Sequence, residues 1–393
     1  MKISILLPYK ENYSPIYAGA VSLFVNSTSK ISKYKKNIIV YGSTDYNKKL
    51  SNNYENIDLP KRFLVSQSKV YVNKFLEIQK KIKPDIIEVH NRPIYINDLT
   101  ELKSNIVLYF HNDPITMFGS KSIKERISLL KKCSKIIFNS MWSKKKFLTN
   151  LDRFYHKSEK LEVIHQSINK TKVNFNKKKK IITFVGKLNS AKGYDIFCRA
   201  IIKILNKYPK WSANVAGDEP REKINVSHKN LINFGFQKHS KVLKIFEKTS
   251  IAVACSRWQE PFGRTSLEAS SRGCAVIISN SGGLPETITN GIILRRLNST
   301  ELFNSIEKLI LNKKKLIDLQ QRSFKNFYLT DKFISKKIDN YRKKISTKYK
   351  LNLNITKSLS SKKILHITNF NERHDGRLFY NTGRRINNGF VRL

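Results

Sequence analysis

The sequence predicts an α/β fold built from parallel sheets in two domains. Short apolar runs of strand length alternate with segments of helical period along the chain, which is the pattern of parallel strands joined by helices. With 393 residues, the chain is long enough for two domains with complete cores. A polar stretch, residues 169–180, ends in four consecutive lysines and divides the pattern into two halves. The sequence therefore predicts a linker there.

Both halves repeat the same succession of elements. In the first half we expect strands at 3–7, 37–41, 85–90, 106–110, 135–139 and 161–164, and helices at 18–31, 70–82, 122–133 and 141–148. In the second half we expect strands at 181–185, 212–216, 231–234, 251–255 and 274–279, and helices at 194–207, 241–248, 264–272, 300–311 and 313–324. A final segment, residues 331–345, has apolar side chains mostly three to four positions apart, which predicts an amphipathic helix.

Residues 260–268 carry the clearest chemical pattern. They follow a predicted buried strand and open the predicted helix 264–272, and ligands of parallel sheets bind at such carboxyl ends of strands. Gly263 stands where the helix begins, so free backbone N–H groups there favour an anion. Glu268 follows about five residues later, roughly 7–8 Å along the axis, which is about the reach from a diphosphate to the ribose of a nucleotide. Glu260 precedes the helix and faces the other end of the ligand.

The stretch EPFGRTSLEASSRGCAVIISNSGGLPE, residues 260–286, resembles the donor-site signature of the retaining glycosyltransferases of family 4, which have the GT-B fold. The resemblance rests on the two glutamates eight positions apart, on the glycine before the second strand, and on the Gly-Gly-Leu-Pro-Glu loop. It implies that Gly283 and Glu286 help to shape the sugar end of the donor site. The alternative is an ordinary strand–helix–strand unit with a solvated glutamate at each end.

This resemblance implies two Rossmann-like domains whose parallel sheets face each other across a cleft, with a final helix that crosses back to the N-terminal domain. We therefore expect an acceptor-side domain at 1–168, a nucleotide-sugar-binding domain at 169–330 and a crossover helix at 331–349. Residues 350–393 form a tail in which 362–370 looks like another first strand. The tail is either the start of a second α/β module or an appended strand or disordered segment.

Residues 186–193 resemble a second family element, G-R-x-x-x-x-K-G, whose two cations grip the donor diphosphate. Lys192 matches the family lysine, and Lys187 replaces the family arginine. The replacement keeps the charge but loses the planar bidentate fork of a guanidinium group. The alternative is that both are two more lysines of a lysine-rich chain.

Two residues of the first half complete the candidate site. His111 follows the predicted strand 106–110, where the family often has a histidine that reaches the transferring sugar; otherwise it caps a turn beside Asp113. Gly19 lies in a loop that borders the cleft in the family, and a glycine lets the backbone approach a ligand closely. A plain helix start explains Gly19 equally well.

The charge balance is strongly basic. The chain has 75 Lys and Arg against 29 Asp and Glu, a net charge of +46, which suits an anionic partner such as a membrane surface, nucleic acid or acidic glycan. Because the lysines are scattered rather than clustered, compositional drift explains the charge as well. The four cysteines form no CxxC pair and no metal-binding spacing, which favours a reducing compartment. No apolar run reaches the roughly 18 residues of a spanning helix. We expect a cytoplasmic protein, at most peripheral at the inner face of the plasma membrane.

The resemblance implies transfer of a hexose from a nucleotide sugar to a hydroxyl of a cell-surface glycan or lipid-linked acceptor, as in polysaccharide or lipopolysaccharide biosynthesis. There is no D-x-D pair, so we expect no metal and no cofactor beyond the donor substrate. The catalytic candidates are His111, Glu260 and Lys192, and the donor-binding candidates are Lys187, Lys192, Gly263, Glu268, Gly19, Glu286 and Gly283. Two alternatives remain, a nucleic-acid-binding protein and a catalytically dead sugar-nucleotide-binding module.

Overall fold

The structure, a computed structural model, describes residues 1–59 and 66–359, with the backbone alone described for 348–359. It contains one compact unit, Met1–Ile345, and a second unit, Ser346–Leu393, of which only the helical start is described. The predicted strand at 362–370 lies outside the described residues. The predicted domain limits within the first unit stay a prediction.

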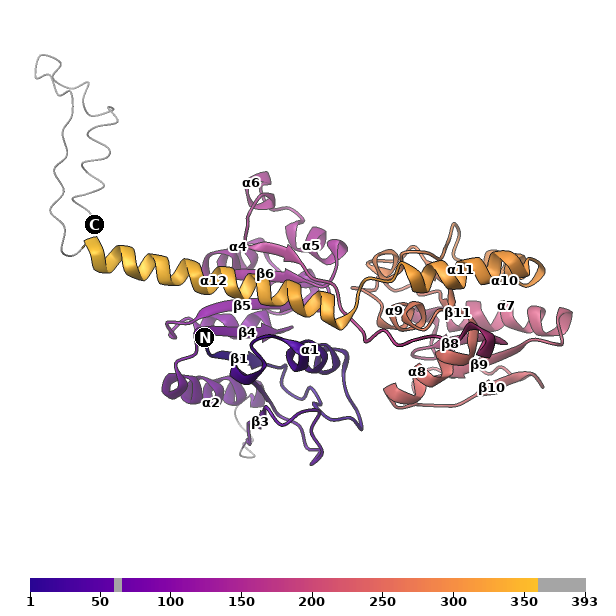
Figure 1. Ribbon diagram of the computed structural model, residues 1–393, viewed down its shortest axis with the longest axis horizontal. Coiled ribbons are helices and arrows are strands. Elements are labelled where there is room, and N and C mark those ends of the chain that lie inside the picture. Colours follow the sequence, from indigo (N-terminus) through magenta and orange to yellow (C-terminus); the bar gives the residue numbers. More distant parts are fainter. Residues whose placement is uncertain (60–65, 360–393) are drawn as a thin grey trace, which may run out of the picture. The chain divides into compact units, whose positions relative to one another are not determined.

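The first half folds around a seven-stranded sheet in which all neighbouring strands are parallel (Figure 1). The strand order is β3-β2-β1-β4-β5-β6-β7, with bounds β1 Ile3–Leu6, β2 Ile38–Gly42, β3 Tyr54–Asn56, β4 Ile86–His90, β5 Asn105–Phe110, β6 Lys135–Phe138 and β7 Leu161–Val163. Every residue of β4 is buried, as expected for a parallel strand covered on both faces. The helices are α1 Ala20–Ile31, α2 Gln67–Ile82, α3 Ile96–Leu99, α4 Ile123–Lys132, α5 Met141–Leu148 and α6 Arg153–His156.

The second half folds around a six-stranded parallel sheet of order β10-β9-β8-β11-β12-β13. Its strands are β8 Lys179–Val185, β9 Ser212–Ala216, β10 Leu231–Asn233, β11 Thr249–Ala254, β12 Ala275–Ser279 and β13 Ile292–Leu294. Its helices are α7 Tyr194–Lys207, α8 His239–Lys248, α9 Arg264–Ser271, α10 Ser299–Leu311 and α11 Lys313–Lys325. Short 3-10 turns include η3 Pro114–Thr116, η5 Ser190–Lys192 and η6 Leu284–Thr287. The predicted fold class, two parallel-sheet Rossmann-like domains, is confirmed.

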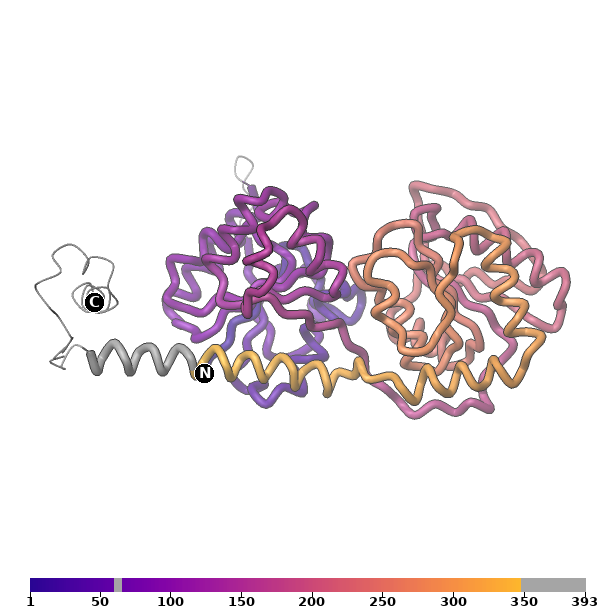
Figure 2. Tube along the Cα trace, turned by 90° about the horizontal axis from the view of Figure 1, so that it is seen from above, coloured from indigo at the N-terminus to yellow at the C-terminus, as the bar shows by residue number. Residues whose placement is uncertain are grey.

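The last helix, α12 Asp331–Leu359, returns to the first half. Figures 1 and 2 show its beginning beside first-half elements. Ser335 Oγ donates to the carbonyl oxygen of Thr28 in α1 at 2.9 Å, and the Asp339 carboxylate accepts from the backbone N–H of Lys33 at 2.9 Å. The predicted crossover helix is therefore confirmed, and it continues beyond the expected end at residue 349.

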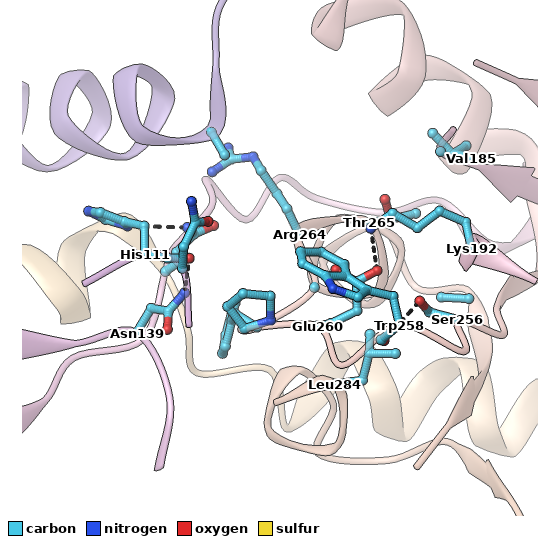
Figure 3. Close-up of a pocket in the computed structure, with 18 of the residues that line it drawn as sticks. His111, Asn139, Val185, Lys192, Ser256, Trp258, Glu260, Arg264, Thr265 and Leu284 are labelled. Atoms are coloured by element: carbon cyan, nitrogen blue, oxygen red, sulfur yellow. Dashed lines mark hydrogen bonds and ion pairs between the residues drawn. The ribbon is translucent and has the colours of Figure 1, made fainter. Parts of the chain in front are cut away.

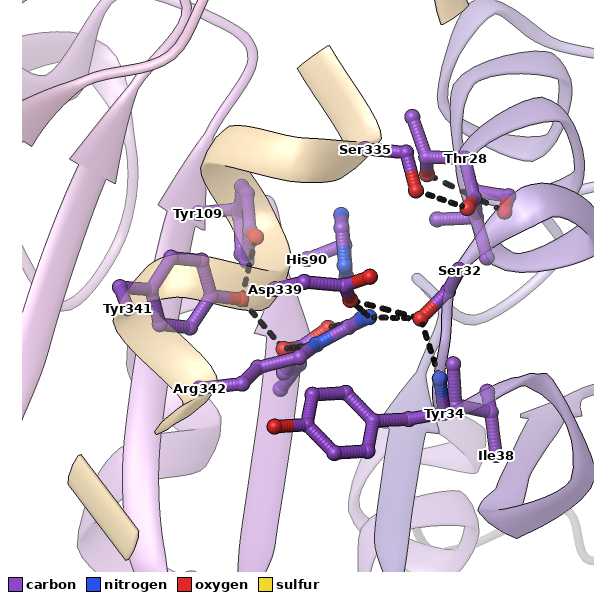
Figure 4. A network of polar contacts seen from close by, with 12 residues as sticks. Thr28, Ser32, Tyr34, Ile38, His90, Tyr109, Ser335, Asp339, Tyr341 and Arg342 are labelled. Carbon is purple, nitrogen blue, oxygen red and sulfur yellow. Dashed lines mark hydrogen bonds and ion pairs between the residues drawn. The ribbon is translucent and has the colours of Figure 1, made fainter. Parts of the chain in front are cut away.

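A buried ion pair joins α12 to the first sheet (Figure 4). The Arg342 guanidinium donates from Nε and Nη2 to the two carboxylate oxygens of Glu88 in β4, each at 2.7 Å. The hydroxyl of Tyr341 donates to the same carboxylate and also meets the hydroxyl of Tyr109 in β5. Arg342 and Glu88 are 1% exposed, so this pairing leaves no charge unpaired in the core.

The lysine run of the predicted linker is partly structural. Lys178 Nζ donates to the carbonyl oxygens of Phe246, Thr249 and Arg272 at 2.7–2.8 Å. Burial lowers the pKa of Lys178. A lysine of the predicted linker thus has a structural role, because its ammonium group satisfies three backbone acceptors.

We expect Lys178→Met to lower the free energy of unfolding by about 2 kcal/mol, because the three carbonyl oxygens lose their donor. Urea unfolding measures this change. Lys177→Met is the matched control. The Lys177 side chain is exposed, so this substitution should change the free energy of unfolding by less than about 0.5 kcal/mol. Equal effects of the two substitutions would contradict a structural role for Lys178.

We expect Arg342→Met to destabilise the chain by about 3–5 kcal/mol, since it leaves Glu88 charged and buried without a partner. The double variant Glu88→Gln with Arg342→Met should recover much of this loss, because it removes both charges. Thermal and urea unfolding of both variants test the pair, with the exposed Lys336→Met as control. A double variant no more stable than Arg342→Met would rule out the unpaired charge as the cause.

Candidate functional site

A cavity of about 260 Å³ lies at the carboxyl ends of strands from both sheets (Figure 3). Residues of the first half that line it include Ala20, His111, Asn139 and Gln166, and those of the second half include Gly186, Lys192, Glu260 and Gly263. The structure thus brings together four of the predicted site residues, namely His111, Lys192, Glu260 and Gly263.

The start of α9 borders this cavity. Gly263 has a φ of +112°, and a Cβ atom there would come within 2.4 Å of the Leu284 side chain, so the turn requires glycine. Arg264 and Thr265, the first residues of the helix, also line the cavity. The backbone N–H groups of this first turn are the predicted anion site.

Lys192 and Glu260 form an ion pair within the cavity (Figure 3). Lys192 Nζ also lies 4.7 Å from the centre of the Trp258 ring. Lys192 ends η5, and the following Gly193 packs so closely on the Cys255 carbonyl that a Cβ atom would lie 1.9 Å from its oxygen. We expected Lys192 at the diphosphate and Glu260 at the sugar, and in the ligand-free chain the two side chains contact each other directly.

Glu268 lies in an adjoining cavity of about 370 Å³, which shares Ala20, Val185 and Arg264 with the first. Its carboxylate accepts hydrogen bonds from His239 Nε2 at 2.9 Å and from Arg264 Nε at 2.8 Å. Both bonds end on Oε1, which leaves Oε2 for a ligand hydroxyl. Burial raises the pKa of Glu268, but the hydrogen bond from His239 and the charge of Arg264 together hold it below its usual value.

The wall of this second cavity includes two stacked aromatic rings. Phe236 comes from the loop after β10, Tyr17 comes from the first half, and His239 begins α8. The rings of Tyr17 and Phe236 stack with centroids 4.6 Å apart and planes 6° apart. The ring of Tyr17 was not predicted as part of this wall, because a single tyrosine in an irregular loop has no sequence pattern.

His111 is buried and both of its ring nitrogens have neighbours. Nε2 lies 2.9 Å from Nδ1 of His90, and Nδ1 lies 3.4 Å from Nε2 of Gln166. Burial, and then His90, hold the pKa of His111 well below its usual value, and burial lowers the pKa of His90 to about 3. The ring of His111 is therefore neutral near pH 7 and is suited to hydrogen bonding rather than to proton transfer.

The backbone at His111 is held by Asn91. Asn91 has a φ of +55°, and its Oδ1 accepts from the backbone N–H groups of His111 and Asn112, both at 3.1 Å. Asp113 itself caps η3 through Ile115, so the alternative in which His111 caps this turn is wrong. Asn91 and Gln166 were not predicted as site residues. Neither residue lies in a sequence pattern that marks a ligand site.

Glu286 and Gly283 contact the first half. The Glu286 carboxylate accepts from the backbone N–H groups of Met141 and Trp142, at 2.7 and 3.0 Å, and from His165 Nε2 at 3.0 Å. A Cβ atom on Gly283 would lie 3.0 Å from the side chain of Ser140, the residue before α5. The role of Gly283 and Glu286 in shaping the sugar end of the donor site stays a prediction. In this structure the Glu286 carboxylate binds two backbone N–H groups and His165 instead.

Two donor-binding candidates lie apart from this group. Lys187 is exposed after β8 and lines neither of the two cavities. A Cβ atom on Gly19 would lie 2.1 Å from Oε1 of Glu11, so the Glu11 carboxylate occupies the space beside this glycine. Glu11 accepts from the backbone N–H of Ser22 in α1, and burial raises its pKa. A carboxylate of the chain itself thus takes the place where we expected close approach of a ligand.

Comparison with known proteins agrees with this geometry. Residues 165–326 match the family model of the glycosyl transferases group 1. Spore coat protein SA of Bacillus subtilis is 22% identical over 74% of the chain and 84% of that relative. The putative glycosyltransferase YtcC of the same organism is 20% identical over 77% of the chain and 81% of the relative.

Solved structures with the same fold are known. HepE of Anabaena in complex with UDP-glucose superposes with a TM-score of 0.70 at 16% identity, over 88% of this chain and 100% of that one. Sucrose-phosphate synthase of Thermosynechococcus elongatus gives 0.69 at 14% identity over the same shares. The fold is that of the GT-B glycosyltransferases. No helix in the described part of the chain has the length and apolar character needed to cross a membrane.

We expect Glu268→Gln to make the free energy of unfolding less dependent on pH in the acid range. Because the folded pKa of Glu268 is lowered, its stabilising effect is complete above the unfolded value of about 4.3 and is lost as the pH falls through the folded pKa. The wild-type chain should therefore lose up to about 1.4 kcal/mol more per pH unit than the variant in this acid range. Urea unfolding between pH 6 and 3 measures the difference. Glu101→Gln, at a side chain that is 60% exposed, should keep the wild-type slope. Equal slopes for Glu268→Gln and the wild type would contradict a lowered pKa.

Proposed function

We propose that the chain is a retaining glycosyltransferase that moves a hexose from a nucleotide sugar to a hydroxyl of a cell-surface glycan or lipid-linked acceptor without a metal ion. One observation carries the proposal. Two adjoining cavities place the start of α9, Lys192 and Glu260 in one and Glu268 with the aromatic loop in the other. We assign the sugar and diphosphate of the donor to the first cavity and its ribose and base to the second.

The comparisons support a nucleotide-sugar donor. The Anabaena protein has been solved with UDP, with UDP and glucose, and with UDP-glucose, and the family match covers the segment that holds Lys192, Glu260 and Glu268. Among the described residues, no three His, Cys, Asp or Glu side chains gather as metal ligands would. Independence from metal remains part of the proposal.

In the proposed reaction the leaving diphosphate gains negative charge as the glycosidic bond breaks. The first turn of α9 and the Lys192 ammonium stabilise that charge because both are held in place before the reaction begins. The donor phosphate competes with Glu260 for Lys192, so Glu260 becomes free to accept hydrogen bonds from the sugar. Glu268 Oε2 accepts from a ribose hydroxyl.

Retention in this scheme needs no nucleophile from the protein. Glu268 is held by His239 and Arg264, and the neutral ring of His111 is not the imidazolium that would act as an acid at pH 7. The acceptor hydroxyl attacks from the side on which the diphosphate leaves, and the departing phosphate oxygen takes the acceptor proton. His111 then orients the sugar through a hydrogen bond.

A dead sugar-nucleotide-binding module is the second candidate. The observation that favours it is the position of Lys187, which is exposed and lines neither cavity, so that Lys192 would meet the diphosphate without the second cation of the family element. Turnover decides between the two candidates. A binding module would bind the nucleotide sugar but release no nucleoside diphosphate in the presence of acceptors.

We expect one nucleotide among UDP, GDP and ADP, and its sugar conjugate, to raise the melting temperature. At 100 times Kd the gain in stability should be about 2.7 kcal/mol. Glu268→Ala and Lys192→Ala should abolish the shift, because they remove the ribose acceptor and the phosphate cation. Thermal-shift titration measures it.

The matched controls are Glu101→Ala and Lys203→Ala, at exposed side chains away from both cavities, and both should bind as the wild type does. The same titration with a chelator tests independence from metal. If no nucleotide raises the melting temperature of the wild type, the proposed function is wrong.

A further inference from the structure

A third cavity, of about 540 Å³, lies in the first half of the chain. Its walls come from the segment after β4, the segment after β5 and the start of α2. Asn112 lines both this cavity and the 260 Å³ cavity of the candidate site. Because the two cavities adjoin at Asn112, a molecule bound in the third cavity can present one end to the site where the donor sugar would lie.

The wall of the third cavity is largely apolar. It includes Val72, Pro93, Ile94, Tyr95, Met117 and Phe118. Phe118 is 72% exposed and Ile94 is 49% exposed, so a large apolar surface faces solvent beside the site. The two segments are packed firmly together, since a Cβ atom on Gly119 would lie 2.6 Å from the backbone nitrogen of Ile94.

Most polar groups of this wall already have partners. Lys69 pairs with Asp98, and the hydroxyls of Ser68 and Tyr95 lie 2.9 Å apart. Of the charged side chains in this wall, Arg92 has no ion pair in the described part of the chain, and its guanidinium donates to the carbonyl oxygen of Asn91.

The charge of Arg92 also lowers the pKa of Glu11, but a Glu11 oxygen is already bound to the backbone N–H of Ser22. Arg92 therefore offers several free donors next to an apolar wall.

We propose that the third cavity binds the acceptor, and that this acceptor is an amphiphile with an apolar chain joined to a phosphate group. The chain lies on Ile94 and Phe118, the phosphate meets Arg92, and the sugar hydroxyl reaches the donor past Asn112. A neutral glycan would use neither the exposed apolar side chains of this wall nor the charge of Arg92. The inference rests on the proposed glycosyltransferase function, because it assigns the acceptor of the same reaction.

The test measures saturable binding of decyl phosphate below its micelle concentration, with decyl maltoside and inorganic phosphate as comparison probes. The wild type should bind decyl phosphate at least about tenfold more tightly than either comparison probe, because only decyl phosphate uses both the apolar wall and Arg92. Ile94→Ser with Phe118→Ser, and separately Arg92→Gln, should each weaken decyl phosphate about tenfold.

The matched controls lie on α6. Phe154→Ser removes an aromatic ring that is 82% exposed, and Arg153→Gln removes an exposed arginine. Both should bind decyl phosphate as the wild type does. Equal loss in control and cavity variants, or equal binding of decyl maltoside and decyl phosphate, would overturn the proposal.

Nucleotide binding separates this inference from the proposed function. The cavity variants should keep the nucleotide-induced thermal shift, which also shows that they are folded. Failure of the acceptor proposal then appears as lost discrimination among the three probes with the nucleotide shift intact. Failure of the proposed function appears as absence of that shift in the wild type, whatever the probes do.

Discussion

The buried pair between Glu88 and Arg342 is the contact on which the arrangement of the first half depends. It fixes the last helix on the central strand β4, and Tyr341 extends the contact to Tyr109 of β5. The ring of His90 stacks on Tyr109 with centroids 4.3 Å apart. His90 in turn contacts His111 at the edge of the candidate site. A continuous set of packed side chains therefore joins the crossover helix to the cavity.

The acidic residues of the candidate site share one property, which is that each already has a partner in the ligand-free chain. Glu260 pairs with Lys192, Glu268 with His239 and Arg264, and Glu286 with a helix N-terminus and His165. In a strongly basic chain, unpaired carboxylates would be exposed to many competing lysines. A ligand at such a site replaces existing partners of the carboxylates. The side chains are therefore already positioned before the ligand binds.

The fold could be predicted because alternating apolar runs and helical segments are local signals, and because glycines such as Gly263 mark turns that only glycine permits. The strands β3 and β13 were not predicted, since β3, Tyr54–Asn56, has no apolar run and β13, Ile292–Leu294, is a short run close behind the turn at 284–287. Four site residues, His111, Lys192, Glu260 and Gly263, were placed together correctly by motif. Contacts between segments far apart in sequence, such as Tyr17 on Phe236 or Asn91 under His111, could not be predicted, since nothing in one segment specifies its distant partner.

The Lys192–Glu260 pair also affects how an anionic ligand reaches the site. The two charges cancel locally, so this pair itself contributes little net attraction, while the net charge of +46 acts from the whole chain. Salt screens distant exposed charges much more than partly buried pairs. The ionic strength of the solution should therefore govern how fast a nucleotide arrives, whereas the time for which it stays depends on short-range bonds that salt barely alters.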